Sequence, residues 1–139
     1  MNLFKFNYIP LNKDLGLLLV RIVLGFMMIY AHGWGKLINF DTKFHTFPDV
    51  IGIGSEASYI LVTYFECIGA VALILGLYAR FHALGLFIVM LVGFIFAHNM
   101  QLVGQGNGEK ALIYGIGFLL IFLNGAGKYS IDRKTGVRS

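Results

Sequence analysis

Two charged side chains, Arg21 and Glu66, interrupt long apolar runs and are the first candidates for chemistry. A charged group at membrane depth costs a few kcal/mol, so it normally faces the interior of a helix bundle and finds a partner there. With Lys13 and Tyr78 taken as the level of the inner membrane face, a rise of about 1.5 Å per residue puts Arg21 about 12 Å and Glu66 about 18 Å from that face. Because an Arg side chain can span that offset, we predict that the two residues pair. The pair would either fix the helix register or form a charged site for a polar ligand or proton.

His32 and His98 form a second candidate pair near the outer membrane face. The same arithmetic places them about 28 Å and about 25 Å from the inner face, so they share a level. Histidine changes charge near neutral pH and is a common metal ligand, but two His without a third ligand do not predict a metal site. Either these side chains bond to backbone and water, or they form an outer site that hydrogen-bonds a quinone carbonyl or passes protons.

The spacing of these residues indicates two helical faces marked by polar and small side chains. Steps of three and four residues place side chains on one face of a helix. The first face holds Arg21, Gly25, Met28, His32 and Gly35, and the second holds Tyr59, Thr63, Glu66, Ala70 and Leu73. Such faces could line an interior polar track or simply pack together, because helix interfaces in lipid also use small and polar residues.

The elements that would position these side chains are membrane-spanning helices. Hydrophobic residues make up 58% of the 139 residues and charged residues 13%, against roughly 45–50% and about 25% in soluble domains. A span needs about 20 mostly apolar residues. The sequence therefore predicts one all-α domain over residues 1–139, an antiparallel bundle of four transmembrane helices at about 14–36, 57–78, 81–100 and 109–127. The short stretch at 78–80 predicts a tight hairpin, and the long stretch at 33–56 a re-entrant or interfacial segment.

Charge distribution predicts the orientation of this bundle. Lys and Arg accumulate in cytoplasmic segments. With the N-terminus inside, the inner segments would hold Lys5, Lys13, Arg80, Lys128, Arg133, Lys134 and Arg138, and the outer segments only Lys36, Lys43 and Lys110. We therefore expect both termini in the cytoplasm. The net charge of +4 is explained by this bias, and no basic stripe suggests nucleic acid as a partner.

Several segments, taken in order, resemble one family of membrane proteins. Leu19–Gly25 with Tyr30–Leu37 looks like the first helix of DoxX-type proteins. Phe65–Ala70 followed by Leu75–Arg80 resembles the family's Glu-bearing helix and its glycine turn, and Gly125–Asp132 is similar to the segment after its last helix. The resemblance implies a four-helix fold in a bacterial plasma membrane and a loose link to redox metabolism. The related DoxD type is part of a thiosulfate:quinone oxidoreductase, but this chain shows no counterpart of the additional periplasmic domain, so we do not expect that reaction.

These observations lead to three functional hypotheses. The first is a non-catalytic accessory subunit of a quinone-linked redox system, in which Arg21, Glu66, His32 and His98 line a pocket for a quinone. The second is a small proton-coupled transporter, and the third a purely structural membrane subunit. In each case the expected partners are the lipid bilayer and other proteins of a membrane complex, or further copies of the chain. No residue is assigned a catalytic role.

Overall fold

The computed structural model describes residues 10–137, and over this range the chain is helical and contains no strand. The helices in chain order are α1 (Lys13–Met28), α2 (Trp34–Ile38), α3 (Phe40–Lys43), α4 (Ser55–Tyr64), α5 (Ala70–Leu75), α6 (Ala79–Val92), α7 (Glu109–Asn124) and α8 (Ile131–Thr135). Three single π-helical turns, Ile29–Gly33, Phe65–Gly69 and Gly93–Ala97, follow α1, α4 and α6 without a break. We call these the three π-turns.

Three continuous helices are long and apolar enough to cross a membrane. They are Lys13–Ile38 with 26 residues, Ser55–Leu75 with 21 and Ala79–Ala97 with 19, and their mean hydropathies are 1.9, 1.9 and 2.1. The expected all-helical membrane architecture is thus confirmed for three spans among the described residues. The fourth apolar helix, α7, has 16 residues, slightly less than the shortest length typical of a span.

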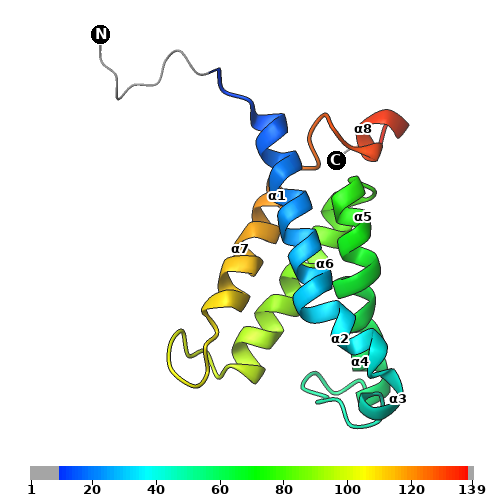
Figure 1. Ribbon diagram of the computed structural model, residues 1–139, viewed down its shortest axis with the longest axis vertical. Helices are drawn as coiled ribbons and strands as arrows, with labels where there is room; N and C mark the ends of the chain where they lie inside the picture. Colours follow the sequence, from blue (N-terminus) through cyan, green and yellow to red (C-terminus); the bar gives the residue numbers. More distant parts are fainter. Residues whose placement is uncertain (1–9, 138–139) are drawn as a thin grey trace.

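The helices form an elongated bundle with two distinct ends (Figure 1). The start of α1 and the short helix α8 lie at one end, which we call the tail end. The chain segments that join α2 to α4 and α6 to α7 lie at the opposite end, the loop end. Between the ends, α6 packs against α7 and α1 packs against α5.

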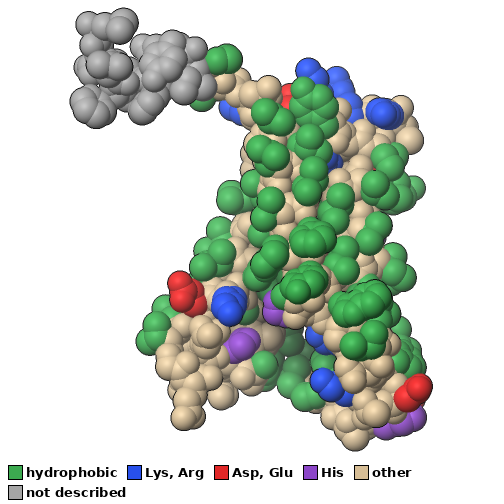
Figure 2. Space-filling model, viewed as in Figure 1, with side chains coloured by type: hydrophobic (Ala, Val, Ile, Leu, Met, Phe, Trp, Pro, Cys, Tyr) green, Lys and Arg blue, Asp and Glu red, His purple; other side chains and the backbone are tan. Residues whose placement is uncertain are grey.

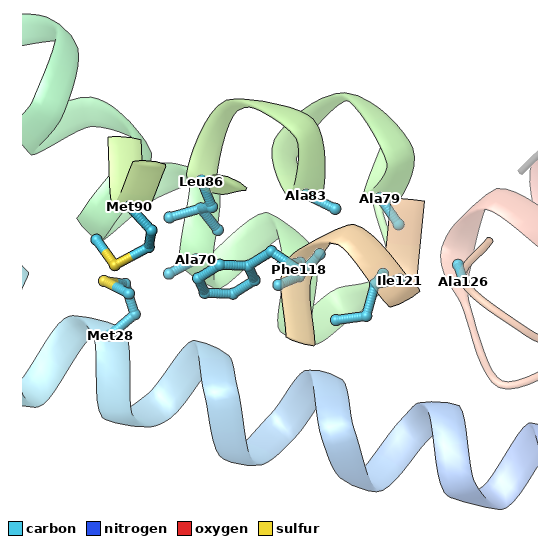
Figure 3. Packing of buried hydrophobic residues seen from close by; sticks show 10 residues of the cluster. Met28, Ala70, Ala79, Ala83, Leu86, Met90, Phe118, Ile121 and Ala126 are labelled. Carbon is cyan, nitrogen blue, oxygen red and sulfur yellow. The ribbon is translucent and has the colours of Figure 1, made fainter. Parts of the chain in front are cut away.

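An apolar core joins α1, α5, α6 and α7 in the middle of the bundle. Phe118 and Ile121 of α7 are fully buried against Leu86 of α6. Figure 3 shows that Met28 of α1 and Met90 of α6 face each other on the side of this core toward the loop end. Burial of these side chains holds the helices against one another, and the side chains fill the interior of the bundle between its two ends.

The hairpin between α5 and α6 is held by the C-terminal segment. The connection turns at Gly76 and Tyr78, which adopt left-handed conformations with φ of 69° and 44°. The buried carboxylate of Asp132 accepts hydrogen bonds from the backbone nitrogens of Tyr78 (2.7 Å) and Ala79 (2.9 Å). These nitrogens belong to the unpaired start of α6, so Asp132 caps that helix from a distant part of the chain. The tight hairpin predicted from the sequence is present.

At the loop end, the connection between α2 and α4 is anchored on one aromatic side chain. Tyr59 is fully buried, and its hydroxyl donates a 2.6 Å hydrogen bond to the carbonyl of Lys36. The rings of Phe40, Phe44 and Phe47 lie edge-on to the Tyr59 ring. The connection is therefore packed against the start of α4 and returns over the bundle.

A single exposed carboxylate organises the far part of the same connection. The two oxygens of Asp49 accept hydrogen bonds from the backbone nitrogens of Gly52, Ile53 and Gly54 and from the hydroxyl of Ser58. Hydrogen bonds to the charged form, first of all that from Gly54, lower the pKa of Asp49. The turn at 49–54 thus depends on an ionised side chain.

Candidate ligand cavity

A cavity of about 690 Å³ opens at the loop end of the bundle. Figure 2 shows a notch between the two lower lobes of the molecule, with Lys and His side chains at its edge. The wall is largely apolar and includes Phe47, Ile51, Val89, Met90 and Phe96. Small-molecule sites in proteins are typically cavities of this size with apolar walls and a few polar groups.

Each of the three π-turns contributes to the wall of this cavity. His32 belongs to the first π-turn, Glu66 to the second and Phe96 to the third. A π-turn inserts one extra residue into a helix, changes which face the following side chains occupy, and is frequent at functional sites. Three interruptions of this kind, one in each membrane-spanning helix, therefore meet at the same volume.

The most buried charged contact of the cavity joins Lys36 and Glu66. The Nζ atom of Lys36 lies 2.6 Å from Oε2 of Glu66, and the two side chains are 19% and 3% exposed. Lys36 Nζ also contacts the carbonyl oxygen of His32 at 3.5 Å. The helices approach closely here because Gly33 has no side chain, and a Cβ at that position would collide with the backbone of Glu66. The ion pair is thus built into the contact between the first two spans.

The two histidines of the sequence prediction lie on the wall of this cavity. His32 stands edge-on to the ring of Tyr114, with ring centroids 5.7 Å apart. The Nδ1 atom of His98 is hydrogen-bonded to the carbonyl oxygen of Gly106. Lys36 and Lys110 line the same cavity as the two histidines. The structure therefore brings Glu66, His32 and His98 together around one volume.

Arg21 lies elsewhere, and the predicted Arg21–Glu66 contact is wrong. Arg21 is fully buried at the tail end, where its Nη2 atom donates a 2.6 Å hydrogen bond to the carbonyl of Tyr129. A Cβ at Gly76 would collide with the guanidinium group. Glu66 instead pairs with Lys36.

The error has a physical cause in the depth of the first helix. The prediction set Lys13 and Tyr78 at the same level, but the first turns of α1 extend past the α5–α6 hairpin. They pack there against the C-terminal segment, where the backbone nitrogen of Lys128 donates to Oδ1 of Asp14. Arg21, not Lys13, therefore lies level with Gly76. Glu66 is ten residues from Gly76, about 15 Å along the helix.

Sequence reasoning assigned Lys36 to an outer loop and missed its part in the cavity. The signal was available, because Lys36 follows His32 by four residues and so shares its helical face. The predicted first helix, at about 14–36, already ended at Lys36, but counting from Lys13 put this residue about 35 Å from the inner face, far from the level of Glu66. Lys110 also lines the cavity, and its position at the start of α7 carried no comparable signal.

As an assembly, the cavity can hold an amphiphile with a polar head. Lys36 and Lys110 are hydrogen-bond donors, Glu66 is an acceptor when ionised, and each neutral imidazole offers one donor and one acceptor. The apolar walls suit the carbon skeleton of such a molecule.

Comparisons with known proteins agree with this architecture. The DoxX family model matches residues 16–99 of the chain. A protein of Haemophilus influenzae described as uncharacterized is 31% identical over 123 residues, which cover 83% of this chain and 87% of that protein. The inner membrane protein YqjF of Escherichia coli K12 is 32% identical over 123 residues, covering 87% and 92% of the two chains. No solved structure matches the chain. With its three apolar helices, the chain is a multi-pass protein of the bacterial inner membrane and belongs to the DoxX family.

Proposed function

We propose that the chain is a non-catalytic subunit of a quinone-linked redox system and binds the headgroup of a quinone-type molecule in the loop-end cavity. The observation that carries this proposal is the cavity itself, an apolar volume of about 690 Å³ with Glu66, Lys36, His32 and His98 on its wall. Quinones combine an apolar skeleton with two ring oxygens at opposite edges. The apolar wall suits the former and the polar groups suit the latter.

The sidedness of the cavity favours binding over transport. Its lining includes no residue of α5, no residue of α6 before Val89, and no residue of α7 beyond Ala111. Beyond Met90 the bundle is filled by the apolar core, including Leu86 and Phe118. A proton-coupled transporter needs a path that reaches both faces, and the packed core supplies none in this conformation.

The proposed topology has α7 as a fourth span and both termini in the cytoplasm. Side chains along α7 are apolar and exposed, among them Ile113, Ile116, Leu120 and Leu123, which suits contact with lipid. The two ends of the described chain lie at the same end of the bundle (Figure 1), as an even number of spans requires. The tail end also carries most of the Lys and Arg residues, which favours the cytoplasmic side.

A fusion at the C-terminus tests this topology. We expect a fluorescent protein that folds only in the cytoplasm to fluoresce after Ser139, and a phosphatase that is active only in the periplasm to stay inactive there. The same pair of reporters placed after Gly104, between α6 and α7, should give the opposite result. A fluorescent reporter at both positions would contradict a fourth span.

A direct binding measurement tests the function. The purified chain in lipid nanodiscs should bind a short-tailed benzoquinone, and Lys36→Met should weaken that binding about tenfold because it removes a charged hydrogen-bond donor to the quinone oxygens from the wall. Lys43→Met is the matched control, because Lys43 is exposed and does not line the cavity. Its affinity should equal that of the unchanged chain.

Two results would overturn the proposal. One is the absence of quinone binding by the folded chain together with no quinone in its lipid extract. The other is a proton flux in proteoliposomes that disappears in Glu66→Gln, which would favour the transporter. If the membrane complex keeps its activity when Lys36 and Glu66 are both replaced by apolar residues, the chain would be a purely structural subunit.

A further inference from the structure

The hydrogen bond of His98 fixes which of its ring nitrogens carries the proton. A carbonyl oxygen can only accept, so the Nδ1 atom of His98 must be the donor in its bond to Gly106. In the neutral imidazole, the other nitrogen, Nε2, is then an acceptor. Among residues 10–137 no residue is hydrogen-bonded to Nε2, and His98 is one of the residues that line the cavity. His98 therefore has an acceptor available to a molecule bound there.

His82 has the same arrangement with a different outcome. Its Nδ1 atom donates to the carbonyls of Leu77 (3.0 Å) and Tyr78 (3.1 Å). Its Nε2 atom, however, lies 3.4 Å from the hydroxyl of Tyr64, which can donate to it. The acceptor of His82 is occupied within the protein, whereas the acceptor of His98 is left for another molecule.

Glu66 supplies a second acceptor to the same volume. Its Oε2 atom is paired with Lys36, but its Oε1 atom has no hydrogen bond within the described part of the chain. Oε1 is not among the buried polar atoms that lack a partner, so it keeps accessible surface, and the residue lines the cavity. Two acceptors, on two residues that line the same cavity, thus have no hydrogen-bond donor among the described residues.

We infer that the cavity selects a ligand that donates hydrogen bonds, namely the reduced, hydroxyl-bearing form of an aromatic headgroup, over the oxidised carbonyl form. This inference rests on the proposed function and specifies its ligand as a hydroquinone. The two ring hydroxyls donate to Nε2 of His98 and Oε1 of Glu66. His98 acts as a specificity-determining residue, and no electron transfer is assigned to the chain.

The preference follows from what each form leaves unpaired. A carbonyl oxygen cannot donate, so an oxidised headgroup takes two acceptors out of water without pairing them, and unpaired buried polar groups are costly. Sites built to pair a hydroxyl discriminate strongly against analogues that lack it. Lys36 and Lys110 can donate to the ligand oxygens in either redox form, so they do not distinguish the two.

The experiment compares three probes on the unchanged chain in nanodiscs. They are a short-tailed benzoquinone, the corresponding hydroquinone kept reduced under anaerobic conditions, and the dimethyl ether of that hydroquinone. We expect the hydroquinone to bind about tenfold more tightly than the quinone. The ether keeps the ring and both oxygens but has no donor, so it should bind no better than the quinone.

Variants then assign the preference to a residue. His98→Phe should reduce the preference for the hydroquinone to about twofold, chiefly by weakening the binding of the hydroquinone. His45→Phe is the matched control, because this exposed histidine does not line the cavity, and it should keep the full preference. Thermal unfolding of both variants checks that they are folded.

Three outcomes separate the inference from the function on which it rests. Equal affinity for quinone and hydroquinone, or tight binding of the ether, would overturn the inference and leave the proposed function standing. Full preference in folded His98→Phe would overturn the role of His98. Failure of every probe to bind would overturn the proposed function, and the inference with it.

Discussion

The two ends of the bundle both bury charged side chains, but they use them differently. At the tail end, Arg21 and Asp132 are fully enclosed, and each bonds to main-chain atoms of another segment. At the loop end, Glu66 is equally buried, yet it pairs with the side chain of Lys36 beside an open volume of about 690 Å³. The charged side chains at the tail end therefore hold segments of the chain together, whereas those at the loop end lie beside a cavity.

This difference shows that a buried charge does not by itself identify a functional site. The Nε and Nη1 atoms of Arg21 have no hydrogen-bond partner among the described residues, which could suggest a ligand. The Nη1 atom is nevertheless packed against Gly76, where even a methyl group would not fit. The distinguishing observation is the free volume beside the charge, together with polar atoms that face it.

The largest expected effect is a loss of stability when a charged side chain at the tail end is removed. Asp132→Ala removes two charge-assisted hydrogen bonds to the start of α6, and it also removes the negative charge near Arg21. Each such bond contributes about 1.5–3 kcal/mol, so we expect a loss of about 3 kcal/mol in the free energy of unfolding. Denaturation of the purified protein in detergent measures this loss.

The matching control is Asp41→Ala, an exposed carboxylate in α3, which should change stability by less than about 0.5 kcal/mol. The folded fraction of Asp132→Ala should still bind the cavity ligand with unchanged affinity, because the cavity lies at the opposite end. A large loss of affinity in that folded fraction would remove the distinction between a structural and a ligand-binding end.

Much of the architecture could be predicted from the sequence because lipid imposes a simple rule. The apolar runs predict where the helices lie, and the short 78–80 stretch predicts a hairpin. The distribution of Lys and Arg predicts the orientation. The helices begin and end close to the expected residues. The helix α7 begins at Glu109, as expected, and ends at Asn124, three residues early, because Gly125 leaves the helical conformation with φ of 80°.

The site was predicted only in part, because pairing across helices depends on their axial offset. Counting residues placed His32 and His98 at one level near the outer face, but it placed Glu66 about 7–10 Å deeper in the membrane. The partner of Glu66 could not be predicted in this way, because the packing of the C-terminal segment against α1 sets the level of Arg21. The π-turns also have no simple sequence signal, and they determine which side chains face the cavity.

The smallest expected effect concerns the segment that covers the cavity. Val50 and Ile51 line it, and the turn that holds them depends on the ionised carboxylate of Asp49, whose pKa is lowered by hydrogen bonds from Gly54 and its neighbours. A lowered pKa means that the contribution to stability is complete above the ordinary value of about 4. It is lost as the pH falls through the lower pKa of the folded protein. We therefore expect the 49–54 turn to open more often below about pH 4.

Asp49→Asn removes the ionisable group: its one amide oxygen can still accept hydrogen bonds, as Oδ1 does from Gly52 and Ile53, but its NH2 group cannot replace Oδ2 as the acceptor for Gly54. Amide hydrogen exchange at Gly52, Ile53 and Gly54, corrected for the intrinsic dependence of exchange on pH, measures the opening. In the unchanged chain the protection of these amides should fall below about pH 4, whereas in Asp49→Asn it should be slightly lower throughout and independent of pH. Protection that stays constant in the unchanged chain down to pH 2 would show that ionised Asp49 does not hold the turn. The segment that carries Val50 and Ile51 would then be held in place by the packing of Phe47 against Tyr59, just as the tail end is held by buried contacts.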